Sequence, residues 1–362
     1  MVIYEPQAWG HAETYLMRLV EAIGSRADVV VAAPRRLLVR LDPSLPTYEV
    51  PDHSGRFATL RRVDSFRRVV RSLNAGLGFY LSGDKALPLL AFMPRLHSKQ
   101  AVLMLRPREP GVPEAGRPEW LSRLYFCAQE IAVAVWRARR DASVIFTLDE
   151  RVANRWSKRS GSGRIAWLPE PPVQIAGDAL SPTEPERSGV LLYGSLTPRK
   201  GVERLAAAMK VLSESSRGMT VTLAGAVDQA YAPELMRVVR EMRSNGITVE
   251  LQLERLSEEG CLRLLRSAEV CAVPYVNHRG MSRVLLEAAV CGTPVVAEDY
   301  GLIGHLVNSH GLGVAVDCSD PNALAAATVS ARRETRRGDL EKFASRYSTD
   351  QFAAALNCMG IR

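Results

Sequence analysis

The order of apolar and polar positions along the chain predicts strands and helices that alternate. Short apolar runs, many of them β-branched, mark buried strands at residues 2–4, 29–33, 101–105, 143–148, 190–193, 221–224, 247–253, 270–274, 295–297 and 314–316. Segments with apolar positions three or four residues apart predict helices, chiefly at residues 60–73, 120–140, 202–212, 233–244, 257–267, 302–307 and 322–330. This βαβ alternation is typical of an α/β fold with parallel sheets.

A proline-rich stretch at residues 169–189 interrupts the alternation and shows no clear periodicity. It predicts a linker between two domains, and a chain of 362 residues is long enough for two. We therefore expect one domain at residues 1–168 and another at residues 190–345. A C-terminal helix within residues 346–362 could pack back on the first domain.

Residues 279–294, RGMSRVLLEAAVCGTP, combine a loop, an apolar helix and a helix stop at Gly292. A loop that enters a helix leaves backbone N–H groups unpaired, and these suit a diphosphate. Glu287 lies about one and a half turns into this helix, where its carboxylate could accept hydrogen bonds from a ribose. The alternative is an ordinary βα unit with an exposed glutamate.

Charge is distributed unevenly between the two halves. Residues 1–180 hold 26 Lys and Arg against 18 Asp and Glu, which accounts for the whole net charge of +8. Residues 60–73 predict an amphipathic, arginine-rich helix, with Leu60, Val63, Phe66, Val70 and Leu73 on one face and Arg61, Arg62, Arg67, Arg68 and Arg71 on the remaining surface. The first half should therefore attract an anionic acceptor or a membrane surface. An arginine-rich composition without a partner, and a solvated helix face, are the alternatives.

Two loops of the first half carry candidate binding residues. Gly10 and His11 follow the first strand, although a solvent-exposed loop histidine is an equally good interpretation. Arg106 and Arg108 follow the strand at residues 101–105, at the sheet edge where open α/β sheets bind ligands. The prolines that separate these arginines exclude regular strand pairing.

The six cysteines show no CxxC spacing, and several lie in apolar segments. They are typical of reduced core residues in a cytoplasmic protein and do not predict disulfides or zinc ligands. No apolar run approaches the ~18 residues of a spanning helix. We therefore expect a cytoplasmic protein, with peripheral contact at the inner membrane face as an option.

The motifs of the second half resemble those of a known family, the retaining GT-B glycosyltransferases of family 4. The similar segments are Tyr193-Gly194 with Arg199-Lys200-Gly201 (their G-R…K-G loop), residues 268–274 (A-D-V-x-V-x-P), residues 279–287 (the register of Glu-x7-Glu) and residues 287–296 (E-A-x-A-x-G-x-P-V-V). Residues 10–13 resemble their G-G-A-E motif. The resemblance is dense over residues 190–325 and thin over residues 1–180.

This resemblance implies an α/β, GT-B fold, with two Rossmann-like domains whose parallel sheets face a central cleft. A nucleotide-diphospho-sugar would bind mainly to the second domain and the acceptor to the first. Lys200 would neutralise the diphosphate as the bond to the sugar breaks. Glu287 would hold the ribose, and backbone N–H groups near residues 281–283 would meet the phosphates.

The resemblance also assigns the other site residues. Catalytic roles would belong to Lys200, Arg199 and Arg279, donor contacts to Gly194, Ser195, Gly201, Glu254, Leu256, Gly280, Met281, Ser282, Arg283 and Glu287, and acceptor or sugar contacts to Gly10, His11, Arg106 and Arg108. Members of this family retain the anomeric configuration and need no bound metal. We therefore expect no metal site and no cofactor beyond the donor substrate.

The chain departs from the family pattern at three positions. The first glutamate of the Glu-x7-Glu motif is Arg279, the arginine next to Gly194 is replaced by Ser195, and a histidine of the first domain is replaced by Arg106. One interpretation is that Arg199, Arg279 or Arg283 supplies the cation lost at Ser195. A negatively charged donor sugar would then be one explanation of Arg279. The other interpretation is loss of transfer activity.

The leading hypothesis is thus a hexosyltransferase-type enzyme that acts on a lipid-linked, polysaccharide or natural-product acceptor. The alternative is a catalytically silent GT-B scaffold that binds a glycan or another protein. A nucleic-acid partner is not expected, because aromatic residues do not interleave the arginines of the basic half.

Overall fold

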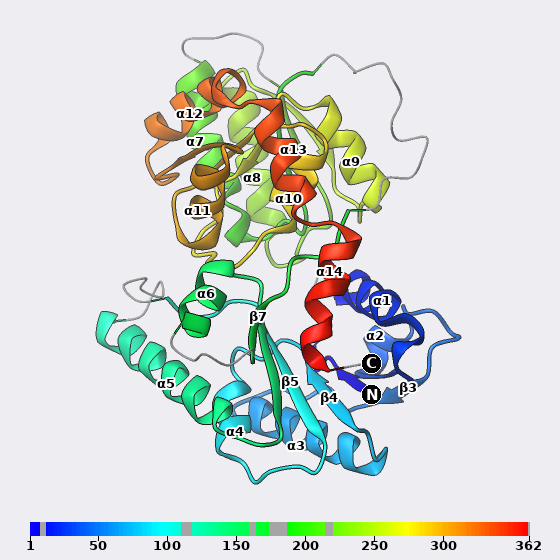
Figure 1. Ribbon diagram of the computed structural model, residues 1–362. Helices are drawn as coiled ribbons and strands as arrows, with labels where there is room; N and C mark the ends of the chain where they lie inside the picture. Colours follow the sequence, from blue (N-terminus) through cyan, green and yellow to red (C-terminus); the bar gives the residue numbers. More distant parts are fainter. Residues whose placement is uncertain (8–11, 110–117, 159–163, 174–186, 214–219, 361–362) are drawn as a thin grey trace. The chain divides into compact units, whose positions relative to one another are not determined.

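The computed structural model describes residues 1–7, 12–109, 118–158, 164–173, 187–213 and 220–360 (Figure 1). The chain divides into two compact units, one of residues Met1–Pro172 with Ser348–Arg362 and one of residues Val173–Tyr347. Each unit is built around one parallel sheet with helices on both faces (Figure 1). The predicted α/β class is therefore confirmed.

The first unit holds a seven-stranded sheet in the order β3-β2-β1-β4-β5-β6-β7, and every neighbouring pair is parallel. Its strands are β1 (Val2–Tyr4), β2 (Val30–Ala33), β3 (Thr47–Glu49), β4 (Leu77–Tyr80), β5 (Lys99–Met104), β6 (Ala142–Thr147) and β7 (Ile165–Trp167). Its α-helices are α1 (Ala12–Ile23), α2 (Arg35–Leu38), α3 (Ala58–Ser72), α4 (Leu87–Phe92), α5 (Glu119–Arg137), α6 (Glu150–Lys158) and α14 (Thr349–Leu356).

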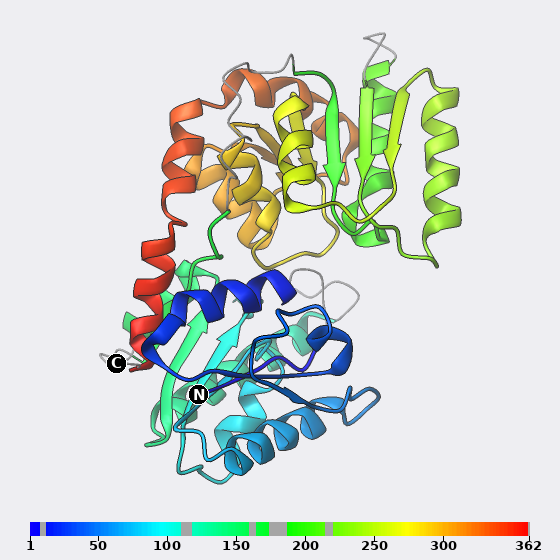
Figure 2. The ribbon, with the colours of Figure 1, turned by 90° about the vertical axis from the view of Figure 1, so that its right-hand side faces the viewer.

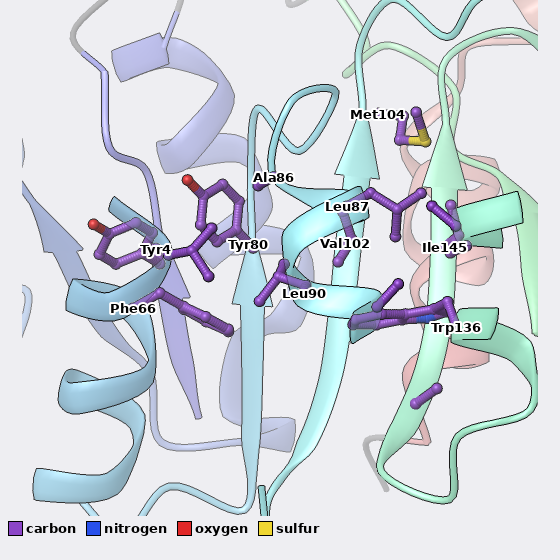
Figure 3. Close-up of a cluster of buried hydrophobic side chains, with 14 of the residues drawn as sticks. Tyr4, Phe66, Tyr80, Ala86, Leu87, Leu90, Val102, Met104, Trp136 and Ile145 are labelled. Carbon is purple, nitrogen blue, oxygen red and sulfur yellow. The ribbon is translucent and has the colours of Figure 1, made fainter. Parts of the chain in front are cut away.

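A large apolar cluster fills the space between this sheet and helices α3, α4, α5 and α6. Figure 3 shows the rings of Tyr4, Phe66 and Tyr80 together at one end of the cluster and Trp136 at the other. The ring centroids of Tyr4 and Tyr80 lie 5.1 Å apart, and those of Phe66 and Tyr80 lie 5.3 Å apart. Offset or edge-on contacts of this kind stabilise aromatic pairs.

The C-terminal helix α14 belongs to the first unit. It lies beside α1 (Figure 2), where the rings of Tyr15 and Phe352 meet edge to face with centroids 6.3 Å apart. Arg26 donates a hydrogen bond to Asn357 Oδ1 at 2.7 Å. The chain therefore returns to its first unit after it has completed the second.

The second unit holds a six-stranded parallel sheet in the order β10-β9-β8-β11-β12-β13. Its strands are β8 (Val190–Tyr193), β9 (Thr220–Ala224), β10 (Thr248–Gln252), β11 (Val270–Val273), β12 (Val295–Glu298) and β13 (Gly313–Val316). Its α-helices are α7 (Val202–Ser213), α8 (Ala232–Ser244), α9 (Glu258–Ser267), α10 (Arg283–Val290), α11 (Gly301–His310), α12 (Pro321–Glu334) and α13 (Arg337–Ser345).

The two faces of the second sheet carry different residues because side chains alternate along a strand. Val190 and Leu192 pack with α7, α8 and α12 in one apolar cluster. Tyr193 points to the opposite face, where its hydroxyl meets Glu287 of α10. The alternation of β8 therefore decides which strand residue reaches the helix of the candidate site.

The structure corrects the predicted packing of the arginine-rich helix. Val63, Phe66 and Val70 of α3 are buried as expected, but Leu60 and Leu73 are exposed. Arg67, which the periodicity assigned to the surface, is buried at the side of α3 that meets the core. The long aliphatic part of an arginine side chain tolerates such a position, which residue type alone does not reveal.

The structure also corrects the interpretation of two cysteines as core residues. Cys271, Cys291 and Cys318 are buried free thiols, whereas Cys127 and Cys358 are exposed. Among the described residues, no helix combines the length and the apolar content needed to cross a bilayer.

Candidate functional site

The strand order of the second sheet reverses between β8 and β11, and the candidate site lies at the carboxyl ends of these two strands. The chain runs outward from β8 to β9 and β10 and then crosses back to β11, which pairs with β8. In open α/β sheets, ligands bind at such a switch point. The loop that follows β8 and the loop that follows β11 both begin there.

Two glycines of the loop after β8 permit close contacts, Gly201 with the loop after β11 and Gly194 with the Lys200 ammonium. A Cβ atom at Gly201 would lie 2.1 Å from the carbonyl oxygen of Pro274, and one at Gly194 would lie 2.7 Å from Nζ of Lys200. Both residues have positive φ, 72° at Gly201 and 112° at Gly194, which favours glycine. The N–H of Val276 also donates to the carbonyl of Arg199 at 2.9 Å.

Lys200 is buried between the two loops, with only 8% of its surface exposed. Its ammonium donates to the carbonyl of Tyr193 at 3.0 Å and to the hydroxyl of Tyr275. The same nitrogen lies 4.2 Å from the centre of the Tyr275 ring, within cation–π range. Each of these partners is electrically neutral, so the positive charge of Lys200 is held in place without being cancelled.

Arg199 lies beside Lys200 and is exposed. Its Nη1 contacts Nδ1 of His278 at 2.7 Å. Within the described parts of the chain, no carboxylate forms an ion pair with Arg199 or Lys200. The loop after β8 therefore presents two neighbouring cations without an acidic partner from those parts.

Helix α10 points its N-terminus toward the same edge of the sheet. Ser282 precedes the helix and makes no side-chain cap. Gly280, Met281 and Ser282 are buried, and Arg279 is fixed through its carbonyl, which accepts the N–H of Leu302 at 3.0 Å. An N-terminus without a side-chain cap attracts anions, since its first N–H groups point outward and the helix dipole is positive there.

Glu287 is not the exposed glutamate of an ordinary βα unit, because only 4% of its surface is accessible. One carboxylate oxygen accepts the hydroxyl of Tyr193, and the other accepts Nε of Arg283 at 3.0 Å. Burial raises the pKa of Glu287 above the usual carboxyl range, although the charge of Arg283 and the hydrogen bond from Tyr193 act in the opposite direction. Burial likewise raises the pKa of Tyr193.

Arg283 is occupied by carboxylates of its own unit. Besides Glu287, its guanidinium contacts Glu258 of α9 at 2.7 Å, and its side chain is buried. Breaking one partner of such a buried pair leaves an uncompensated charge, which is strongly destabilising. Arg283 thus holds α10 against α9. Because it is already paired with two acids, it is poorly suited to supply the charge missing at Ser195.

Residues 187–333 match the family described as glycosyl transferases group 1. A phosphatidyl-myo-inositol mannosyltransferase of Mycobacterium leprae is 24% identical over 90% of this chain and 84% of its own length. An alpha-maltose-1-phosphate synthase of Mycolicibacterium smegmatis is 27% identical over 89% of this chain and 85% of its own.

The second half of this chain is therefore similar to the group 1 glycosyltransferases. Among solved structures, Anabaena HepE in complex with UDP and glucose superposes with a TM-score of 0.69 at 17% identity, over 98% of this chain and 97% of that one. The expected GT-B fold is confirmed. Both relatives are named as sugar-transferring or synthesising enzymes, which supports hexosyltransferase activity and gives no support to a silent scaffold.

The remaining residues predicted to contact the donor lie around the same edge of the second sheet. Ser195 is exposed one residue after Gly194, and Arg279 is half-buried in the loop before α10. Glu254 and Leu256 lie in the loop between β10 and α9. In the described ranges, no group of three or more His, Cys, Asp or Glu side chains is placed to hold a metal ion.

On the acceptor side, Arg106 is exposed at the end of β5, and its backbone N–H donates to Asp84 Oδ1 at 2.7 Å. Arg108 exchanges two backbone hydrogen bonds with the side chain of Gln129, and its guanidinium stacks 4.8 Å from the centre of the Tyr125 ring. Gly10 and His11 lie outside the described residues.

Sequence reasoning missed three residues that the structure places in the site: Tyr193 as a partner of Glu287, and Tyr275 and His278 as partners of Lys200 and Arg199. Tyr193 was part of the matched loop motif, but its role follows only from the direction of its side chain. The other two sit in the loop after β11 at no motif position, so only their contacts identify them.

The raised pKa of Glu287 predicts a pH-dependent contribution to stability. The folded chain binds this proton more tightly than the unfolded chain. The contribution is therefore fully present below the ordinary carboxyl pKa and is lost as the pH rises from there through the raised pKa of the folded chain. We expect the unfolding free energy of wild type minus that of Glu287→Gln to fall between about pH 4 and about pH 7 in urea titrations.

Glu234→Gln is the matched control. The hydrogen bond from Arg237 lowers the pKa of the exposed Glu234. Any change in the unfolding free energy of wild type minus that of Glu234→Gln should therefore be a rise with pH. A rise with pH for Glu287→Gln would show that the pairing with Arg283 outweighs burial and would contradict the account.

Proposed function

We propose that this chain transfers a hexose from a nucleotide-diphospho-sugar, with retention of the anomeric configuration and without a bound metal. The observation that carries the proposal is the environment of Lys200. An ammonium has three protons, and two of them go to the Tyr193 carbonyl and the Tyr275 hydroxyl. In the described parts of the chain the third has no acceptor, which leaves it for an anionic ligand.

The anion that suits these groups is a diphosphate. Lys200 and Arg199 supply two neighbouring positive charges, and α10 supplies backbone N–H groups at its N-terminus. When the bond between sugar and phosphate breaks, negative charge grows on the leaving diphosphate. Cations that are already in place stabilise that charge without reorganisation, and one such group contributes roughly 3 kcal/mol to the barrier reduction.

Glu287 can hold the ribose of the donor even though each of its oxygens has a protein partner. A carboxylate offers about four lone-pair sites, and Tyr193 and Arg283 use two of them. These two donors also fix the direction of the carboxylate. The solved structure of Anabaena HepE is a complex with UDP and glucose, which supports a nucleotide-sugar donor for this chain.

Retention and metal independence are proposed from the resemblance of the second-half motifs to the retaining family. Arg199 and Lys200, the two cations of the loop after β8, support metal independence, because they supply positive charge at the leaving group from the protein itself.

For the acceptor, we propose an anionic, lipid-linked molecule bound by the first unit. The net charge of +8 over residues 1–180 and the exposed Arg106 support an anionic acceptor. The phosphatidyl-myo-inositol mannosyltransferase, by its name, acts on a phospholipid, which supports a lipid-linked one. Such an acceptor places the enzyme at the inner face of a membrane.

Helix α5 supports contact with that surface. Trp120, Leu124 and Ile131 follow one face of the helix and are 66%, 56% and 56% exposed. Arg123, which also pairs with Glu119 of the same helix, is exposed one residue before Leu124, and Arg108 stacks on Tyr125. Aromatic and apolar side chains flanked by arginines suit the interface of an anionic bilayer.

A ligand screen tests the donor side. We expect one of UDP, GDP, ADP and dTDP, or a sugar derivative of one of them, to raise the melting temperature of the wild-type chain, since a ligand of the folded state stabilises it. Gly194→Ala should abolish the shift because its Cβ would displace the Lys200 ammonium.

Gly246→Ala is the control for Gly194→Ala. Gly246 also has positive φ, 79°, but nothing lies within 4 Å of its Cβ position. Each substitution should cost about 1–2 kcal/mol of backbone strain, and Gly246→Ala should keep the ligand shift. The absence of binding and of turnover across the panel would overturn the proposed function.

A vesicle assay tests the acceptor side. We expect wild type to sediment with vesicles that contain phosphatidylglycerol, less with pure phosphatidylcholine, and less as salt increases. Replacing both Trp120 and Leu124 by Ser should weaken binding at least about tenfold, given the apolar area lost. Val329→Ser, which removes an exposed apolar residue from α12, should have no effect. Equal sedimentation of all three proteins would contradict the membrane contact.

A further inference from the structure

His278 connects the two loops of the donor site. It is buried in the loop after β11, and its Nε2 lies 3.1 Å from the carbonyl oxygen of Met281, at the entrance to α10. Its Nδ1 lies 2.7 Å from Nη1 of Arg199, in the loop after β8. One side chain therefore joins the loop that carries the cations to the loop that leads into the helix N-terminus.

The chemistry of these partners fixes the form of the ring. A carbonyl oxygen only accepts hydrogen bonds, so Nε2 must carry a proton and donate it to Met281. A guanidinium only donates, so Nδ1 must be unprotonated and accept from Arg199. His278 is thus a neutral imidazole that holds Arg199 without cancelling its charge.

Tyr275 likewise holds Lys200 without cancelling its charge. Its hydroxyl accepts from the Lys200 ammonium, and its ring face lies 4.2 Å from the same nitrogen. The Tyr275 ring meets the His278 ring edge to face, with an angle of 83° and a centroid distance of 5.5 Å. Both rings are buried, so each restricts the other.

We propose that His278 and Tyr275 are positioning residues that fix Arg199 and Lys200 as a preset pair of charges for the diphosphate. Two adjacent cations repel each other, and carboxylate partners would hold them only by neutralising them. Neutral acceptors hold them and leave the charge available to the ligand. The inference rests on the proposed function, since it assigns a role to residues around the same donor site.

The comparison of two His278 variants tests this role. His278→Phe keeps a ring against Tyr275 but removes both hydrogen bonds. His278→Gln offers a carbonyl oxygen to Arg199 and an N–H to Met281. We expect His278→Phe to weaken binding of the nucleoside diphosphate about tenfold, because a hydrogen bond to a charged group is lost, and His278→Gln to restore part of the affinity.

The monophosphate separates positioning from general stability. Titration calorimetry is carried out with UDP, GDP and ADP and, for each, with UMP, GMP and AMP. A damaged fold weakens diphosphate and monophosphate alike, whereas loss of the preset cations weakens mainly the diphosphate. We therefore expect the dissociation constant of the monophosphate divided by that of the diphosphate to fall toward one in His278→Phe. Tyr275→Phe, which keeps the ring face and loses the hydroxyl, should give a smaller change in the same direction.

His305→Gln is the control, because His305 lies on α11 and contacts Ser309. If wild type binds none of the diphosphates, the proposed function fails. If wild type prefers the diphosphate and His278→Phe keeps that preference, the positioning role alone is overturned. Equal loss of affinity for diphosphate and monophosphate would also overturn it.

Discussion

The candidate site depends on a buried ammonium that neutral groups hold in place. Removing the charge of Lys200 from water is costly, and a protein usually offsets such a cost with a carboxylate. Here a backbone carbonyl, a phenol hydroxyl and an aromatic face surround the ammonium instead. Because none of them carries a negative charge, these groups leave the positive charge of Lys200 uncancelled, and the proposed diphosphate would neutralise it.

The backbone makes this arrangement possible. The parallel pairing of β8 and β11 brings two loops to one sheet edge. Gly201 allows the two loops to approach without a side-chain clash, and Gly194 leaves room for the Lys200 ammonium. On the face of β8 opposite the Tyr193 side chain, Val190 and Leu192 pack against α7, α8 and α12. Tyr193 therefore serves twice, through its carbonyl toward Lys200 and through its hydroxyl toward Glu287.

The second unit could be predicted from the sequence far better than the first. Its strands are near-continuous apolar runs, and its glycines and caps mark the helix ends, as Ser257 does for α9 through a hydrogen bond from Gly260. In the first unit, the short strands β3 and β4 and the short helices α2, α4 and α6 were not predicted. The exposure of Leu60 and the burial of Arg67 depend on which side of α3 packs on the core, and residue type does not encode this.

Within the site, the motif positions were predictable and their partners were not. The sequence alone indicates that Lys200 lies in the loop after a strand and that Glu287 lies in a helix. The pairing of Arg283 with Glu258, and the contacts of His278 and Tyr275, arise between segments that tertiary structure alone brings together. The burial of Glu287 also follows from the packing of α10 against α9 and not from its position in a motif.

The most direct test of the account is a crystal structure of the chain with a bound nucleoside diphosphate. The account predicts that the β-phosphate contacts the Lys200 ammonium, that the N-terminus of α10 donates to the phosphates, and that the ribose hydroxyls reach Glu287. A nucleotide bound at another place, or phosphates out of reach of Lys200, would contradict it.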